Sequence, residues 1–387
     1  MQGNKRLWLV MVLALLAALL SAVLVLSLSQ IRPVRAQDAS AQASAAAITA
    51  RLAEISPKPA WITPDPAKVL TRIGFGSCLD QKKPQPIWTD IIKDKPDLFL
   101  MLGDNVYGDA KPPDMQALFD AYKVQAIQPE LAAARAAMPF LAIWDDHDFG
   151  KNDAGGSFAG KRTAADAFFA FWQRQREPGR NDAMYYSRTI GPAGRHVQII
   201  MLDTRFDRSD LTRKPADFPH WGPYGPDPDP AKQMIGPDQW TWLERELKAP
   251  ADIRLLVSST QVLAEGHGHE RWGNFPRERE RLLKLIADTG ANGVILLSGD
   301  RHHAAIYRQS NGRYPLVEAT SSALNLSYGP SKDGRIPPLV SDIYSAENYG
   351  LIDIDWAAGQ VALQVKAIGG ETKLRQSIAF AELGLKR

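Results

Sequence analysis

Cysteine is almost absent from this sequence, because Cys78 is the only one among 387 residues. An internal disulfide is therefore excluded, and Cys78 is a small buried residue, a reactive thiol or a metal ligand. An excess of one charge is also lacking, since 46 basic and 43 acidic side chains leave a formal net charge of +3. There is no long run of lysine and arginine, so we expect no nucleic-acid partner. The length allows one large domain or two ordinary ones.

One long apolar run stands near the N-terminus. Lys5 and Arg6 precede an uncharged stretch from Leu7 to Leu28, which is long enough to cross a bilayer and longer than the apolar part of a secretory signal. The residues VRA at 34–36 match the small-residue spacing of a signal-peptidase site, so a cleaved signal is the alternative to an anchor. We expect export, action outside the cytoplasm in the periplasm or at the cell surface, and membrane contact through this segment.

The sequence divides into three parts. We assign 1–36 to the signal or anchor, 37–68 to a tether rich in Ala, Ser and Pro, and 69–387 to one catalytic domain. In that domain, strand-length apolar runs lie at 72–77, 97–102, 139–144, 196–202, 253–259 and 293–298. Helical patterns lie between them at 84–94, 162–176, 236–249 and 276–290, and the tail contains further strand-like runs. This alternation predicts an α/β fold.

One connection, residues 207–235, is too long for a simple link between elements and is rich in Pro and Asp. It is either a surface excursion or a lid that faces the substrate, and we favour the surface excursion.

Polar side chains follow the end of each of the six apolar runs. The sequences are GSC at 76–78, GDNVYGD at 103–109, DDHD at 145–148, DTR at 203–205, TQ at 260–261 and GDRHH at 299–303. In an open α/β sheet, ligands bind beyond the carboxyl ends of the strands, so we expect these groups to converge. Two metal ions about 3.5–4 Å apart, acting on a phosphate ester, would require such a set of carboxylates and histidines.

The spacing suggests a role for each of the strongest candidates. Asp104 is placed to bridge two ions, Asp146 and Asp300 to hold one of them, and His302 to reach the other. Asp300 and His302 are two residues apart, so on extended backbone their side chains face the same way. We expect His147 beside the ions, where it would protonate the leaving oxygen or stabilise the transition state.

Seven short motifs, in order, resemble those of the PhoD-like family of alkaline phosphatases and phosphodiesterases, within the calcineurin-like metallophosphoesterase superfamily. They are FGSC at 75–78, GDNVY at 103–107, WDDHD at 144–148, LDTR at 202–205, STQ at 259–261, FPRE at 275–278 and SGDRH at 298–302. The wider superfamily has D-x-H, G-N-H and G-H-x-H, where this chain has Ser77-Cys78, Asp146 and Asp300. The resemblance covers roughly residues 70–350.

The resemblance implies a metallophosphoesterase-like α/β sandwich with helices flanking a two-sheet core, and a centre that holds Fe³⁺ beside Ca²⁺. Carried over by position, the iron ligands would be Cys78, Asp104, Tyr107 and His302, and the calcium ligands would be Asp104, Asp146, Asp300 and Asn152. Thiolate, phenolate and carboxylate suit a trivalent iron, whereas carboxylates and amides suit calcium.

These features together predict a hydrolase of small phosphate mono- or diesters, with His147, Asp146 and Arg205 as catalytic residues. Arg205 would clamp the phosphate through its guanidinium, or would form a structural ion pair with Asp203. One alternative is a phospholipase-type diesterase acting on lipid head groups. Another is an envelope protein that binds metal and phosphate without turnover. The segment EGHGHE, with His267, His269 and Glu270, is interpreted as part of the rim or surface.

Overall fold

The computed structural model describes residues 48–180 and 182–385. The chain divides into Met1–Glu54 and Ile55–Arg387; of the first unit, residues 48–54 are described and are helical. The predicted signal or anchor at 1–36 and the start of the tether lie outside the described residues. Within the described part of the chain, no helix has both the length and the apolar character needed to cross a membrane.

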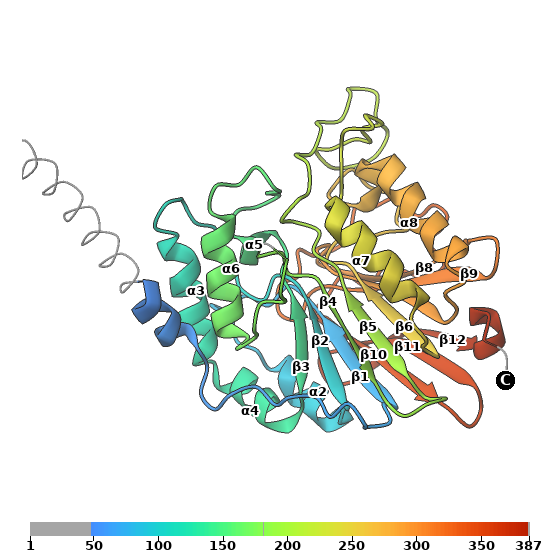
Figure 1. The fold of residues 1–387 in the computed structure, drawn as a ribbon, viewed down its shortest axis with the longest axis horizontal. Helices are drawn as coiled ribbons and strands as arrows, with labels where there is room; N and C mark the ends of the chain where they lie inside the picture. The colour runs from blue at the N-terminus through green and yellow to red at the C-terminus, as the bar shows by residue number, and fades with distance from the viewer. Residues whose placement is uncertain (1–47, 181, 386–387) are drawn as a thin grey trace, which may run out of the picture. The chain divides into compact units, whose positions relative to one another are not determined.

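Two six-stranded sheets form the framework of the second unit (Figure 1). The strands of the first sheet, in spatial order, are β12 (Thr372–Ala379), β11 (Gln360–Ala367), β10 (Asn348–Asp355), β1 (Arg72–Gly76), β2 (Leu98–Leu102) and β3 (Phe140–Ile143). The strands β1, β2 and β3 are parallel. The remaining pairs, from β1 outward to β12, are antiparallel.

The second sheet has a parallel centre and antiparallel edges. Its strands, in spatial order, are β4 (Tyr186–Ile190), β5 (Val197–Met201), β6 (Ile253–Val257), β7 (Val294–Ser298), β9 (Pro315–Ser321) and β8 (Ala304–Ser310). The six apolar runs correspond to β1, β2, β3, β5, β6 and β7, so these predicted strands are confirmed. The strands β4, β8 and β12, which lie at sheet edges, were not predicted from the sequence.

A hydrophobic core lies between the two sheets. Alternate residues of the central strands belong to it, such as Leu98 and Leu100 on β2 and Leu255 and Val257 on β6. The residues between them are also buried, as in the fully buried β2 and β6. Because both faces of the strands are covered, each strand reads as a continuous apolar run rather than an alternating one.

Helices cover the outer faces. They are α2 (Ile87–Asp94), α3 (Gln116–Ala126), α4 (Pro129–Ala137), the short α5 (Asp146–Phe149), α6 (Lys161–Phe171), α7 (Pro237–Lys248) and α8 (Pro276–Asp288), with 3-10 turns η1 (Trp272–Asn274) and η2 (Phe380–Leu383). Figure 1 shows α3, α4 and α6 beside the first sheet and α7 and α8 beside the second. On α2, Trp88 packs edge-on against Phe99 of β2, with ring centroids 5.1 Å apart. The predicted α/β sandwich is therefore the observed fold.

The segment just before β1 also packs against this unit, although we assigned it to the tether. Trp61 stacks on Trp172 with ring centroids 4.3 Å apart, and its Nε1 donates a hydrogen bond to the carbonyl of Phe171 at 2.8 Å.

Candidate metal centre

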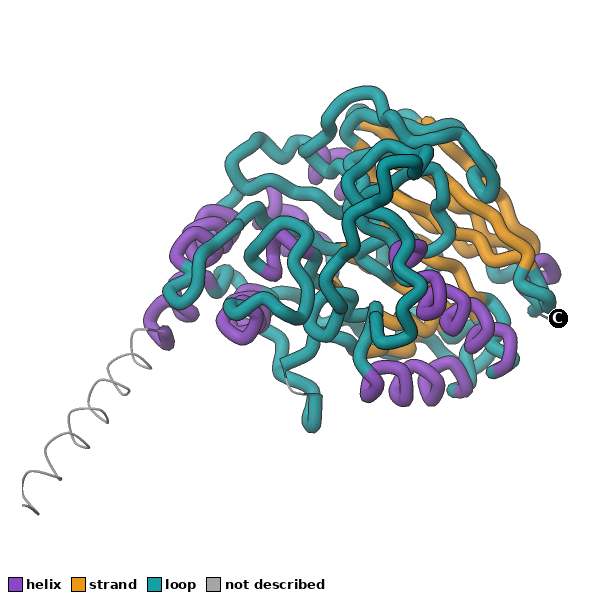
Figure 2. The backbone as a smooth tube through the Cα atoms, turned by 90° about the horizontal axis from the view of Figure 1, so that it is seen from above, coloured by secondary structure: helices purple, strands orange, loops and turns teal. Residues whose placement is uncertain are grey.

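A cavity of about 540 Å³ lies where the polar segments follow the strands. Loops rather than regular elements surround this end of the strands, as Figure 2 shows from above. The predicted site residues that line the cavity are Asp104, Asp146, His147, Asn152, Asp300 and His302. Cys78, Tyr107 and Arg205 are not on its lining. The strand ends therefore converge, as the sequence predicted.

Candidate ligand atoms gather here in overlapping groups. The groups, each with ligand atoms within 4.8 Å of one another, are Cys78 with Asp104 and His302; Asp104 with Asp146 and His147; Asp145 with Asp146 and Asp300; and Asp146 with Asp153 and Glu270. Asp104 and Asp146 each belong to more than one group. A carboxylate shared in this way is placed to contact two ions, which is the role expected for Asp104 from sequence.

At one end of the cluster, a thiol, a phenol and a carboxylate are in contact. The Cys78 Sγ atom is fully buried and lies 3.5 Å from Asp104 Oδ2. The same oxygen accepts a hydrogen bond from the Tyr107 hydroxyl at 3.1 Å. Burial, followed by the charge of Asp104, raises the pKa of Cys78 and of Tyr107 well above their ordinary values. A cation at this point would favour the thiolate and phenolate that the protein alone disfavours.

His302 lies beside this group in the form that binds metals. Its Nδ1–H donates to the carbonyl of Leu326 at 2.7 Å, which leaves the Nε2 lone pair available. Burial lowers the pKa of His302 to about 4, so the ring is neutral at physiological pH. A backbone carbonyl that fixes the tautomer of a histidine is the usual arrangement behind a metal-binding imidazole.

At the other end, the carboxylates of Asp145 and Asp146, both buried, and of Asp300, which is half-buried, converge. Burial raises the pKa of Asp300 well above its usual range and that of Asp145 to about 7. The Oδ2 atom of Asp145 is buried and has no hydrogen-bond partner in the described part of the chain. Buried carboxylates that repel one another, one of them with an unused oxygen, fit a hard cation such as calcium.

The backbone is strained at four of the candidate ligands. Cys78, Asp104, Asp300 and His302 have φ values of 61°, 50°, 68° and 53°, in the left-handed region that residues other than glycine seldom adopt. They follow β1, β2 and β7. Strain of this kind persists only where the surrounding structure fixes it, and it is concentrated at functional sites.

The four residues of DDHD have separate contacts. Asp145 accepts a hydrogen bond from Ser259 at 2.7 Å, and Asp146 lines the cavity. Asp148 is fully buried and accepts backbone N–H groups from Asn105 at 2.8 Å and from Asp145 at 2.9 Å. Asp148 therefore fixes the loop after β2 against the loop after β3, and it does not face the cavity.

His147, the third residue of DDHD, contacts a carboxylate through one of its two ring nitrogens. Its Nδ1 atom lies 3.0 Å from Asp109 Oδ1. Burial opposes protonation of the ring, but the carboxylates of Asp146, Asp104 and Asp109 outweigh it and raise the pKa of His147 to about 11. His147 lines the cavity, and Nε2 is the nitrogen left for a substrate.

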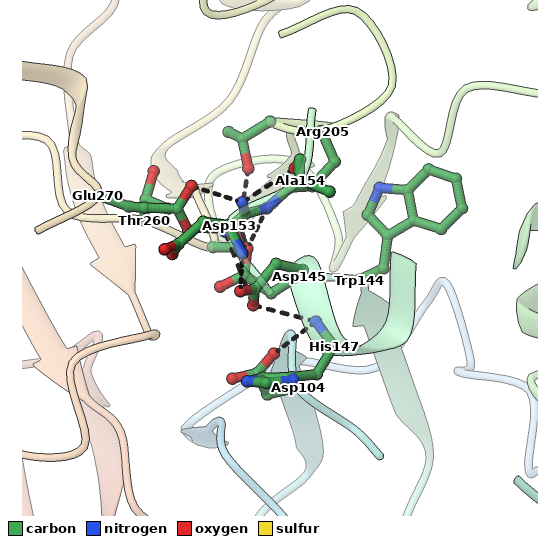
Figure 3. A network of polar contacts seen from close by, with 12 residues as sticks. Asp104, Trp144, Asp145, His147, Asp153, Ala154, Arg205, Thr260 and Glu270 are labelled. Atoms are coloured by element: carbon green, nitrogen blue, oxygen red, sulfur yellow. Dashed lines mark hydrogen bonds and ion pairs between the residues drawn. The ribbon is translucent and has the colours of Figure 1, made fainter. Parts of the chain in front are cut away.

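Arg205 is not on the cavity lining, and Figure 3 shows its side chain among those of Asp145 and Glu270. Its side chain is completely buried. Its Nε donates to Asp145 Oδ1 at 2.6 Å, and Nη1 and Nη2 donate to the two oxygens of Glu270 at 2.8 and 2.6 Å. The prediction that Arg205 clamps phosphate is therefore corrected, because carboxylates occupy its donors. Asp203 accepts the backbone N–H of Arg205 at 2.9 Å and is not the guanidinium's partner.

Several residues of the EGHGHE segment and of the long loop lie differently from what the sequence predicted. Glu270, interpreted as part of the rim or surface, lines the cavity and is buried in its contact with Arg205. His269 of the same segment does line the cavity, while His267 is buried with Nε2 2.9 Å from Gln261 Oε1. The long loop 207–235 contributes Trp221 to the cavity lining, so its interpretation as a mere surface excursion was wrong. The carboxylates of EGHGHE could have indicated that Glu270 belongs to the site. No motif in the sequence singled out Trp221.

A two-sheet α/β sandwich with overlapping ligand groups at the strand ends defines a metallophosphoesterase-like protein. Within that class, the model of the PhoD-like phosphatase family matches residues 74–338. The chain belongs to this family.

The chain is also similar to one further protein in sequence and to two solved structures in fold. Alkaline phosphatase D of Bacillus subtilis (strain 168) is 23% identical over 249 residues, which cover 54% of this chain and 42% of that protein. The chain thus matches less than half the length of that relative. The solved structure of PhoD has a TM-score of 0.63 at 17% identity, over 82% of this chain and 70% of that one. GAP50, the anchor in the inner membrane complex of Plasmodium, has a TM-score of 0.51 at 13% identity, over 81% and 89%. These two structures share the fold.

Proposed function

We propose that this protein is a metal-dependent phosphoric ester hydrolase, a phosphatase or phosphodiesterase of the alkaline phosphatase D type, that acts outside the cytoplasm. The overlap of the ligand groups at Asp104 and Asp146 carries the proposal, because shared carboxylates suit a pair of ions. Membership of the PhoD-like phosphatase family supports it. The apolar run from Leu7 to Leu28 supports export and membrane contact.

The donor set fits iron and calcium. Cys78, Tyr107, His302 and Asp104 would hold Fe³⁺, and Asp104, Asp146, Asp300 and Asn152 would hold Ca²⁺, with Asp145 offering its unpartnered oxygen. When bound, such ions supply Lewis-acid polarisation of the phosphoryl oxygens and lower the pKa of water.

The protein's own groups position the substrate and move the proton. His147 is oriented by Asp109 and donates from Nε2 to the leaving alkoxide as the ester bond breaks. Arg205 holds Asp145 and Glu270, two members of the ligand groups, in place. Its role is to orient these carboxylates, since its donors do not face the cavity.

Turnover and metal content of matched variants test the proposal. The full chain is reconstituted with iron and calcium and assayed with a simple diaryl phosphate. We expect His147→Gln to lower kcat by about 10²-fold or more, the usual effect of losing a general acid, while both metals remain. Asp104→Asn should lose metal and activity together.

The control is His196→Gln, which changes a histidine outside the cavity lining. Wild-type turnover in the metal-loaded His147→Gln variant would refute the assigned role. Metal and phosphate binding by the wild type without any turnover would instead identify a catalytically silent binding protein.

A further inference from the structure

Two exposed aromatic rings stand at the mouth of the cavity. Of the large apolar side chains that are exposed in the described part of the chain, two are aromatic: Trp221, 54% exposed, and Tyr328, 73% exposed. Both line this cavity. Tryptophans such as Trp88, Trp144 and Trp272 are instead fully buried. Exposed aromatic side chains that gather at one place indicate a ligand-binding surface.

These rings lie next to the candidate metal centre. The ring of Tyr328 lies against that of His302, a candidate metal ligand, with the centroids 4.3 Å apart and the ring planes tilted by 44°. The ring of Trp221 lies 6.2 Å from that of His269, on the same lining. A group that occupied this mouth would therefore belong to the ester whose phosphate reaches the metals.

Backbone contacts between three loops hold the rim in place. The loops are 207–235, the EGHGHE segment at 265–270, and 328–336. Gly268 donates its N–H to the carbonyl of Trp221 at 2.6 Å, and the N–H of Gly334 donates to the carbonyl of Gly266 at 2.7 Å. A Cβ atom on Gly266 would overlap the Gly334 carbonyl oxygen. The glycines of EGHGHE thus allow the close approach that joins the two loops bearing the aromatic rings.

The loop that carries Tyr328 is also tied to the metal-binding segment GDRHH. Arg301 donates two hydrogen bonds to the carboxylate of Asp333, at 2.8 and 2.9 Å, and both side chains are largely buried. Tyr328 is therefore presented from an anchored loop. A ring held in place loses little conformational freedom when a ligand stacks on it.

Charge at the rim indicates the kind of ligand. The Lys332 ammonium lies 4.4 Å from the centroid of the Trp221 ring. The positive charge of Lys332 beside Trp221 disfavours a cationic head group such as choline. A planar ring attached to an anionic phosphate meets stacking surfaces and a favourable charge.

We infer that Trp221, Tyr328 and Lys332 form a subsite for a planar ring carried by the substrate, so that the preferred substrates are phosphodiesters in which one alcohol is a nucleoside or a similar aromatic alcohol. This inference rests on the proposed function and specifies its substrate class. Stacking of one base on an aromatic side chain gives a preference of about 10-fold or more.

The test compares three p-nitrophenyl phosphodiesters that share a leaving group and differ in the second alcohol: thymidine, methanol and choline. With the metal-loaded full chain, we expect kcat/KM for the thymidine ester to exceed that for the methyl ester by about 10-fold or more, and the choline ester to show no such advantage. Trp221→Ala and Tyr328→Ala should reduce the thymidine-to-methyl ratio toward one, whereas Trp221→Phe and Tyr328→Phe, which keep a ring, should retain most of it.

Ile127→Ala is the matched control, because Ile127 is 77% exposed but does not line the cavity; its ratio should equal that of the wild type. A wild-type ratio near one, a preference for the choline ester, or a ratio unchanged in both alanine variants would each overturn the inference. If no ester is turned over, the proposed function fails, and calorimetry decides the inference separately. Tighter binding of thymidine 5′-monophosphate than of methyl phosphate, lost in Trp221→Ala, would support the subsite, and equal binding would overturn it.

Discussion

The buried contact of Arg205 with Asp145 and Glu270 predicts a large loss of stability when the guanidinium is removed. Arg205→Met keeps much of the side-chain volume and removes all five N–H donors. It leaves Asp145 and Glu270 buried without the partner that now contacts both. Breaking a buried ion pair from one side costs about 3–5 kcal/mol, because an uncompensated charge stays behind. That is a large part of the roughly 5–15 kcal/mol that an ordinary domain has.

The loss should depend on pH in a defined direction. Burial already raises the pKa of Asp145 to about 7 in the presence of Arg205, and removing the cation raises it further. The pKa of an unfolded aspartate is about 3.9. When the pKa is higher in the folded state, the unfolded state loses its proton first. The free energy of unfolding therefore falls as pH rises from the unfolded pKa to the folded pKa. The difference between wild type and Arg205→Met should therefore be larger at about pH 8.5 than at about pH 6.

Urea unfolding of the chelator-treated protein measures this free energy without a contribution from bound metal. The control is Arg245→Met, because the Arg245 side chain is 70% exposed in its pair with Glu246 and should change stability by about 0.5 kcal/mol or less. A loss below about 1 kcal/mol for Arg205→Met, or a large rise in KM with stability unchanged, would contradict the structural role and restore the phosphate clamp.

Two further predictions concern the loops around the cavity. Burial and the charge of Arg301 lower the pKa of His303 to about 3, whereas an unfolded histidine titrates near about 6.5. Between these two pKa values, the unfolded state binds a proton that the folded state does not, so the free energy of unfolding falls as pH falls. In urea titrations of the metal-free protein, His303→Gln should make this fall smaller between about pH 6.5 and 4. An unchanged dependence of the free energy of unfolding on pH would argue against a buried neutral ring. Gly266→Ala should lower the free energy of unfolding by about 1–3 kcal/mol, because the added Cβ overpacks against Gly334. It should also lower the ratio of kcat/KM for the thymidine ester to that for the methyl ester. Wild-type stability together with an unchanged ratio would contradict the close contact between the two loops.

The central strands could be predicted because they are buried on both faces. Runs such as those of β2 and β6 are apolar throughout, and parallel strands bring the residues at their carboxyl ends to one edge of the sheet. These two facts were enough to predict that Asp104, Asp146, His147 and Asp300 lie together. The strands that were missed have weaker patterns: β4 reads YSRTI, and β12 reads TKLRQSIA with exposed residues along it.

The partners of Arg205 could not be predicted in the same way. Asp145 and Glu270 lie 60 and 65 positions away from it in sequence, and no periodicity relates residues at such separations. The role of the long loop depends likewise on a backbone contact, between Trp221 and Gly268, that no composition rule reveals. A loop rich in Pro and Asp reads as surface because such loops usually are.

The strain and the electrostatic repulsion at this site occur at the same residues, and they have one explanation in common. Asp104 and Asp300 combine a left-handed backbone with a pKa raised well above its usual range, chiefly by burial. Each of these features destabilises the fold. A glycine would adopt the left-handed backbone without strain, and an apolar side chain would avoid the cost of burying a carboxylate. A left-handed residue directly after a strand turns the chain sharply, so donors from β2 and β7 can point at one place instead of past it. A ligand that needs converging negative donors, such as a metal ion, would offset both costs.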